Sequence, residues 1–286
     1  MFEISLWGNA TDLSLLTSLT YDDIQKLQGA EARKKAEKNI LVNNLPAVYA
    51  VLSAAQKSGK KDRRIDIVLD NAGFELYADL ALAGYLLHSG LATEIVLHPK
   101  NMPWFVSDVV PADFGNLLNT LNNPASSFAA DPDSHDPPPA LALTEKHTVD
   151  LQFLFAHWAG LHAEGKLRLQ SNEFWTMPGG YWRLPATAPE LWEDLKGAEL
   201  VIYKGDLNYR KLTGDAAWDP TAPFEEAIGP LGGNSGVRTL ALRTCKADVV
   251  VGLPQGKDEE LREGDVQRKW AWSGKWAVAQ FWDGKK

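Results

Sequence analysis

Ionisable and polar side chains follow several apolar, β-branched segments of this 286-residue chain. Asp70 and Asn71 come directly after IDIVL (65–69), and Asp108 lies a short way beyond EIVLH (94–98). Carboxylate and amide oxygens are ligands that Mg²⁺ and Mn²⁺ accept. Since ligands of open α/β sheets bind outside the carboxyl ends of the strands, Asp70, Asn71 and Asp108 are candidate metal ligands.

Basic side chains follow the same kind of segment and suit phosphate oxygens. A divalent cation beside such groups favours phosphoryl chemistry, in which the metal polarises oxygen and the cations offset developing charge. The basic residues in question are Lys100, Lys204, Arg210, Arg243 and Lys246.

Each of these short patterns also has a purely structural interpretation. Asp70-Asn71 before a helix is an ordinary N-cap, and Lys204-Gly205-Asp206 is a common turn. The lone thiol, Cys245, stands beside Lys246 and could have a lowered pKa, but an inert core thiol is the more common case. The combination of several such strand ends therefore carries more information than any one of them.

The pattern of strands and helices around these residues predicts a doubly wound α/β fold. Continuous apolar runs at 65–69, 94–98, 199–203, 239–242 and 248–253 predict strands buried on both faces of a mainly parallel sheet. A helix over Glu75–His88, ended by Ser89-Gly90, makes the first two runs a βαβ unit. Further helices are expected over 40–57 and 151–169. Helices on both faces of the sheet, and an active site at the carboxyl ends of its strands, complete the prediction.

Composition narrows the class of protein. Lys+Arg 29 against Asp+Glu 37 gives a net charge of −8, which argues against a nucleic-acid partner. One cysteine excludes a disulfide framework or a multi-cysteine metal site. The start of the chain has no signal-peptide pattern, and its apolar runs are too short to span a bilayer, so we expect a cytoplasmic protein without a membrane partner.

Four ordered motifs give the sequence a resemblance to a known family. DNAGFELYADL, HPKNMPWFVSDV, KGDLNYRKL and RTCK, with LWGNATDLSLL near the start and SGKWAVAQF near the end, span nearly the whole chain. Together they resemble the metal-dependent damage-control phosphatase family, in its sugar phosphate phosphatase or acidic residue methyltransferase subgroup. The resemblance implies the same doubly wound α/β fold.

The resemblance also implies a role for each matched residue. Asp70, Asn71 and Asp108 would bind a divalent ion (Mn²⁺, Co²⁺, Ni²⁺ or Mg²⁺), and Asp70 and Asn71 would be catalytic. The attacking nucleophile would be either Asp70 or a metal-bound water. The small phosphorylated metabolite would contact residues of three motifs, namely Glu75, Asp206, Leu207, Asn208, Tyr209, Arg210 and Lys246.

Two features of the organisation remain expectations. Residues 1–286 are predicted to form a single α/β domain that lacks the helical region which usually precedes LWGN in this subgroup. Residues 122–141 hold five of the sixteen prolines and are predicted to be a mobile surface loop.

Three hypotheses about function stay open on the sequence. The first is a metal-dependent phosphatase of small metabolites such as fructose 1-phosphate or fructose 6-phosphate. The second is an S-adenosylmethionine-dependent protein-glutamate methyltransferase, which the missing glycine-rich loop after the first strand disfavours. The third is a non-catalytic short form that binds sugar phosphate.

Overall fold

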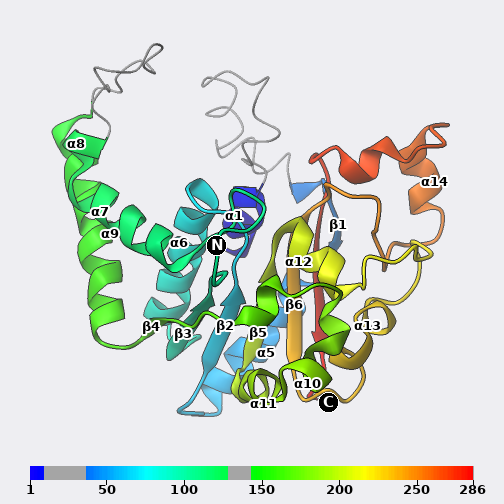
Figure 1. Ribbon diagram of the computed structural model, residues 1–286, viewed down its shortest axis with the longest axis horizontal. Coiled ribbons are helices and arrows are strands. Elements are labelled where there is room, and N and C mark those ends of the chain that lie inside the picture. Colours follow the sequence, from blue (N-terminus) through cyan, green and yellow to red (C-terminus); the bar gives the residue numbers. More distant parts are fainter. Residues whose placement is uncertain (10–36, 128–142, 286) are drawn as a thin grey trace.

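A seven-stranded sheet forms the centre of the protein in the computed structural model, which describes residues 1–9, 37–127 and 143–285 (Figure 1). The strands follow the order β1-β7-β6-β5-β2-β3-β4. They are β1 (Ile40–Asn43), β2 (Arg64–Val68), β3 (Glu94–His98), β4 (Leu167–Leu169), β5 (Leu200–Lys204), β6 (Arg238–Thr244) and β7 (Ala277–Asp283).

The direction of the strands confirms a mainly parallel sheet. β6, β5, β2, β3 and β4 are parallel, β7 is antiparallel to β6, and β1 is parallel to β7. The chain builds outward from β2 to β3 and, in the opposite direction, from β5 to β6. The adjacent strands β2 and β5 therefore flank the switch point, where open sheets of this kind bind ligands.

Each face of the sheet carries its own hydrophobic core. Ile67 faces one core and its neighbour Val68 the other, and Ile202 and Tyr203 alternate in the same way. This two-residue alternation explains why the central strands are mainly apolar on both faces.

Helices cover both faces, as predicted. The first core includes side chains of α1 (Phe2–Gly8), α5 (Leu45–Lys57), α6 (Phe74–His88), α7 (Pro111–Asn122) and α9 (Glu145–Ala163). The second includes side chains of α10 (Leu184–Thr187), α11 (Pro189–Gly197), α12 (Gly205–Leu212) and α13 (Phe224–Ala227). The short α14 (Lys257–Arg262) lies near the end of the chain.

Three predicted elements need correction. The helix expected over 40–57 is strand β1 followed by α5, with Pro46 in the first turn of α5. The helix expected over 151–169 begins earlier, at Glu145, and ends at Ala163 before β4. The strand expected over 248–253 is a largely buried irregular segment, whose backbone bonds to side chains and loops: Gln280 donates to the Val251 carbonyl, and the Gly252 amide donates to the Ala222 carbonyl.

Two predicted segments lie partly outside the described residues. In the proline-rich stretch 122–141, Asn122 ends α7 and Pro124–Ser127 forms α8, so these residues are helical rather than a loop. Residues 128–141, and the part of the LWGNATDLSLL motif that follows Asn9, are not among the residues that the structure describes. Among the residues described, no helix combines the length and apolarity that crossing a bilayer requires.

Candidate active site

Asp70 lies at the switch point, two residues beyond the end of β2. Its side chain is buried and packs against Gly205, the first residue of α12, which follows β5 directly. A Cβ on Gly205 would come within 1.8 Å of Asp70 Oδ2, and Gly205 has φ +81°. Only glycine meets both requirements, so the KG turn after β5 leaves room for the Asp70 carboxylate.

The segment that carries Asp108 is pinned to the end of β2. Asn71 and Asp108 form an isolated antiparallel bridge, and Ser107 Oγ donates to Asn71 Oδ1 at 2.6 Å. Just before them, Phe105 and Val106 adopt φ of 45° and 65°. A positive φ is costly for a β-branched residue, and such strain is concentrated at functional sites.

Glu75 joins this cluster from the first turn of α6. Asn71 Nδ2 donates to Asp70 Oδ2 at 2.9 Å and to Glu75 Oε2 at 2.8 Å. Asp70, Asn71, Glu75 and Asp108, which the sequence predicts to act together, are thus brought to one place by β2, α6 and the loop after β3.

The electrostatics of the cluster are those of an acidic site. The pKa of Asp70 is raised well above its usual range, first by burial and then by the negative charges of Glu75 and Asp108; Lys100 and Lys246 act in the opposite direction. A cation bound among these carboxylates would relieve that repulsion.

Beneath this cluster, Lys204 is held in a buried ion-pair network. Its Nζ lies 3.2 Å from Glu75 Oε1 and 2.9 Å from Asp79 Oδ1, and it donates to the Ser5 carbonyl at 2.6 Å. Burial raises the pKa of Asp79 to about 6 although Lys204 counteracts it. Lys204 therefore supports Glu75 and is not directed at a phosphate.

Two more of the basic residues are also engaged within the protein. Lys100 Nζ lies 3.3 Å from Asp108 Oδ2 and donates to the Leu69 carbonyl at 2.8 Å. Arg243 pairs with Asp206 and stacks 4.3 Å from the centre of the Tyr209 ring. Both side chains are fully buried, so they fix the loops around the site.

Lys246 lies at the edge of the acidic cluster. Its side chain donates to the Asn9 carbonyl at 2.7 Å, and its backbone amide donates to Asp206 Oδ1 at 3.0 Å. Its neighbour Cys245 is fully buried, and burial raises the pKa of this thiol to about 11, so it is an inert core thiol rather than a nucleophile.

In the predicted substrate-binding segment 206–210, Asp206 pairs with Arg243, and the other four residues divide into two groups. Asn208 and Tyr209 are fully buried: Asn208 donates to the Lys204 carbonyl at 2.7 Å and Tyr209 donates to Gln280 at 2.8 Å. These two side chains join α12 to the sheet. Leu207 and Arg210, by contrast, line a cavity.

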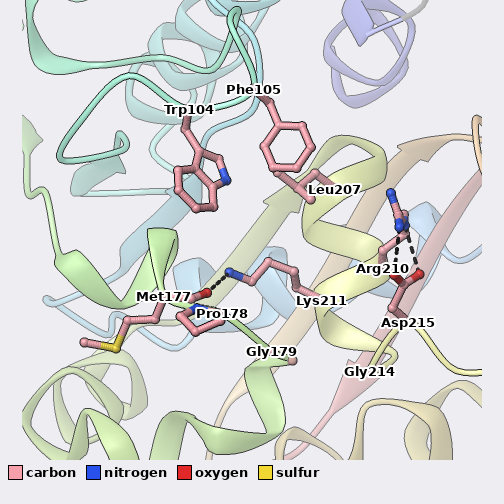
Figure 2. A pocket seen from close by; sticks show the side chains of 11 residues that line it. Trp104, Phe105, Met177, Pro178, Gly179, Leu207, Arg210, Lys211, Gly214 and Asp215 are labelled. Carbon is pink, nitrogen blue, oxygen red and sulfur yellow. Dashed lines mark hydrogen bonds and ion pairs between the residues drawn. The ribbon is translucent and has the colours of Figure 1, made fainter.

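That cavity, of about 250 Å³, lies between α12 and two loops (Figure 2). Trp104 and Phe105 form one wall, and Lys211 reaches across from α12 to donate to the Met177 carbonyl at 2.8 Å. Because Trp104 and Phe105 belong to the loop that carries Asp108, the cavity adjoins the acidic cluster. The lining residues are Trp104, Phe105, Met177, Pro178, Gly179, Gly180, Leu207, Arg210, Lys211, Gly214 and Asp215.

One residue of the site was not assigned a role from the sequence. Asn9, in the LWGN motif, donates through Nδ2 to Asp70 Oδ2 and to Glu75 Oε2, both at 2.7 Å. The motif contributes to the resemblance, but nothing local in the sequence connects it with residues more than sixty positions away.

The donor set for a metal ion is small. Within residues 1–9, 37–127 and 143–285, no three His, Cys, Asp or Glu side chains are arranged to hold one. The predicted trio has two carboxylates, Asp70 and Asp108, and the Asn71 amide. Hard oxygen donors amid excess negative charge fit a divalent cation whose shell is completed by water or substrate.

The mainly parallel sheet, with an acidic site at its switch point, makes this a doubly wound α/β protein. The chain belongs to the damage-control phosphatase ARMT1-like domain family, whose sequence model matches residues 1–261.

Similar proteins include the damage-control phosphatase ARMT1 of Danio rerio, 39% identical over 284 residues, and that of Homo sapiens, 35% identical over 283 residues. Each match covers 98% of this chain but only 57% and 58% of those relatives. A crystal structure of a DUF89 family protein from Pyrococcus horikoshii is 16% identical with a TM-score of 0.44, covering 87% of this chain and 60% of that one.

Proposed function

We propose that this chain is a metal-dependent phosphatase that hydrolyses small phosphorylated metabolites, with fructose 1-phosphate and fructose 6-phosphate as candidate substrates. The observation that supports this most is the gathering of Asp70, Asn71, Glu75 and Asp108 at the switch point with Lys246 at its edge. Membership of a family named for a phosphatase supports the same assignment.

In this proposal, Asp70, Asn71 and Asp108 hold the divalent ion, which would polarise the phosphoryl group when bound. Lys246 and Arg210 bind the phosphate oxygens, since charged donors make short, strong hydrogen bonds to phosphate. Glu75 and Asp206 orient the remainder of the substrate. Asp70 and Asn71 are the proposed catalytic residues.

The cavity gives the non-phosphate part of the substrate a place to bind. Trp104 and Phe105 provide flat apolar surfaces, while Lys211 and Asp215 provide polar groups. An aromatic wall with a few convergent polar groups suits a compact, hydroxyl-bearing metabolite.

The test is phosphate release from a panel of sugar phosphates. The full chain is treated with a chelator and then supplied with Mn²⁺, Co²⁺, Ni²⁺ or Mg²⁺. Release should return with metal in the wild type and be abolished in Asp70→Ala. Glu193→Gln is the matched control, because it also removes a carboxylate but from an exposed ion pair on α11.

Metal-restored release that persists in Asp70→Ala would overturn the assignment of Asp70. A folded, metal-supplied wild type that releases no phosphate from any member of the panel would overturn the phosphatase proposal. Transfer of a labelled methyl group from S-adenosylmethionine to protein glutamate is measured on the same sample and would identify the methyltransferase alternative.

A further inference from the structure

Asn9 occupies a buried position between the first helix and the acidic cluster. It follows the last residue of α1 and is fully buried. Its neighbour Gly8 allows α1 to approach α6 closely, because a Cβ on Gly8 would lie 3.0 Å from Ala78 Cβ and 3.4 Å from Glu75 Cα. The close approach of the two helices delivers the Asn9 side chain to the carboxylates.

The hydrogen bonds of Asn9 determine which way its amide faces. Thr244 Oγ1 donates to Asn9 Oδ1, so the amide oxygen faces β6 and the NH₂ group faces the acids. The two N–H bonds then reach Asp70 Oδ2 and Glu75 Oε2, each at 2.7 Å. The Asn9 amide therefore joins the carboxylate that follows β2 to the one on α6, at the same two oxygens that Asn71 Nδ2 contacts.

The same residue also reaches the basic side of the site. The Asn9 carbonyl accepts the hydrogen bond from Lys246 Nζ at 2.7 Å. Asn9 thus contacts a proposed metal ligand, a proposed substrate-orienting acid and the proposed phosphate-binding lysine. Asp70 and Glu75 lie close together in the sequence, but Asn9 and Lys246 come from distant parts of the chain.

The chemistry of an amide suits this position. Two buried carboxylates repel each other, and an unconstrained pair would move apart. A lysine could join them, but its positive charge would compete with a metal ion for the same oxygens. An asparagine donates to both carboxylates while adding no net charge, and leaves other lone pairs of the two groups for a cation.

We propose that Asn9 is a positioning residue that holds the Asp70 carboxylate, beside that of Glu75, in the orientation that binds the divalent ion. This inference rests on the proposed function. Groups that orient metal ligands typically contribute 10–100-fold to metal affinity or activity. We therefore expect Asn9→Ala to weaken Mn²⁺ binding by at least about tenfold.

The experiment measures the Kd of Mn²⁺ by isothermal titration calorimetry on the full chain, together with Tm, kcat and KM. Asn9→Ala should raise the Kd and lower kcat more than it raises KM. Thr244→Val leaves Asn9 in place but removes the hydrogen bond that orients its amide, so a smaller rise in Kd is expected.

Trp7→Phe is the matched control in α1. The Trp7 ring packs against the first core, and its Nε1 has no hydrogen-bond partner among the described residues, so the change alters packing without touching the acids. It should leave the Mn²⁺ affinity unchanged. If Asn9→Ala does not fold, Thr244→Val alone decides the question.

Folded Asn9→Ala with a wild-type Kd would overturn the inference, as would an equal loss of affinity in Trp7→Phe. The Asp70→Ala variant distinguishes failure of the Asn9 inference from failure of the proposed function. If Asp70→Ala binds Mn²⁺ normally, the proposed metal site is wrong. If Asp70→Ala loses binding while Asn9→Ala and Thr244→Val retain it, only the role of Asn9 is wrong.

Discussion

Arg210 and Asp215 form a two-point ion pair on the wall of the cavity. Arg210 Nε lies 2.9 Å from Asp215 Oδ1, and Nη2 lies 2.7 Å from Oδ2 (Figure 2). The carboxylate therefore occupies the face of the guanidinium that would bind a phosphate in the same bidentate way. Under the proposed function, Asp215 would compete with the substrate phosphate for Arg210.

Asp215→Asn should lower KM for a sugar phosphate without changing kcat. The interaction free energy of an exposed ion pair of this kind is about 0.2–1 kcal/mol, so its removal should decrease KM by at most about fivefold. Asp215 has φ 52°, a conformation that asparagine also tolerates, so the variant should fold normally. Steady-state kinetics check this, with Arg210→Ala as the opposite control, in which KM should rise. A higher KM in Asp215→Asn would mean that the pair orients Arg210 instead.

Gly205→Ala should greatly reduce activity, because the new Cβ and the Asp70 carboxylate cannot occupy the same space. Displacement of a reacting group by about 1 Å can cost on the order of 100-fold in rate. The measurement is kcat at saturating metal, with circular dichroism to confirm the fold.

Gly59→Ala is the control for backbone strain alone. Gly59 also has a positive φ, +74°, but its Cβ would meet nothing within 4 Å. Gly59→Ala should lose stability through backbone strain alone while keeping its activity. Equal activity in the two variants would show that Asp70 has room to move without functional loss.

Lys204→Met should destabilise the protein by about 3–5 kcal/mol, since it leaves the buried acids Glu75 and Asp79 without their cation. The loss should shrink as the pH falls from 8 to below 6. The pKa of Asp79 is already about 6 with Lys204 present, and would rise further without it, so acid neutralises Asp79 in both proteins and the missing cation then matters less. Denaturant unfolding at several pH values measures this.

Lys196→Met is the matched control on the surface, where Lys196 pairs with an exposed glutamate. It should cost less than about 1 kcal/mol and show no such pH dependence. A loss in Lys204→Met that stays constant between pH 8 and 5 would contradict the role given to Asp79.

The sequence predicted the centre of the sheet well, for a physical reason. β2, β3, β5 and β6 are buried on both faces, so their sequences are mainly apolar, and the polar residues that follow them mark one edge. β7 was missed because Gln280 interrupts its run, and β1 because its four residues lead directly into α5.

The errors at 248–253 and at Asn9 have a common cause, which is bonding between distant segments. The apolar run at 248–253 is buried like a strand, but Tyr209, Arg243 and Gln280 supply side-chain partners for its backbone. Asn9 reaches the acids only because α1 packs on α6. Neither relationship has a local sequence signal.

Lys211 should make both stability and substrate binding depend on pH. Its Nζ donates to the carbonyls of Trp175 and Met177 and lies 5.1 Å from the centre of the Tyr181 ring. The pKa of Lys211 is lowered to about 8, chiefly by burial and then by the positive charges of Lys100 and Arg183, while Asp108 acts in the opposite direction.

The direction of the effect on stability follows from the number of protons that Lys211 binds in the folded and unfolded states. Between pH 8 and 10.5, the unfolded chain keeps the proton on Lys211 while the folded protein has lost it. Stability should therefore rise with pH across this window relative to Lys211→Met. Binding should show the reverse: the charged form below pH 8 attracts the negatively charged substrate, so KM of the wild type should rise above pH 8 and that of Lys211→Met should not. Denaturant unfolding and KM measured from pH 7 to 10 test both, and parallel curves for the two proteins would contradict the prediction.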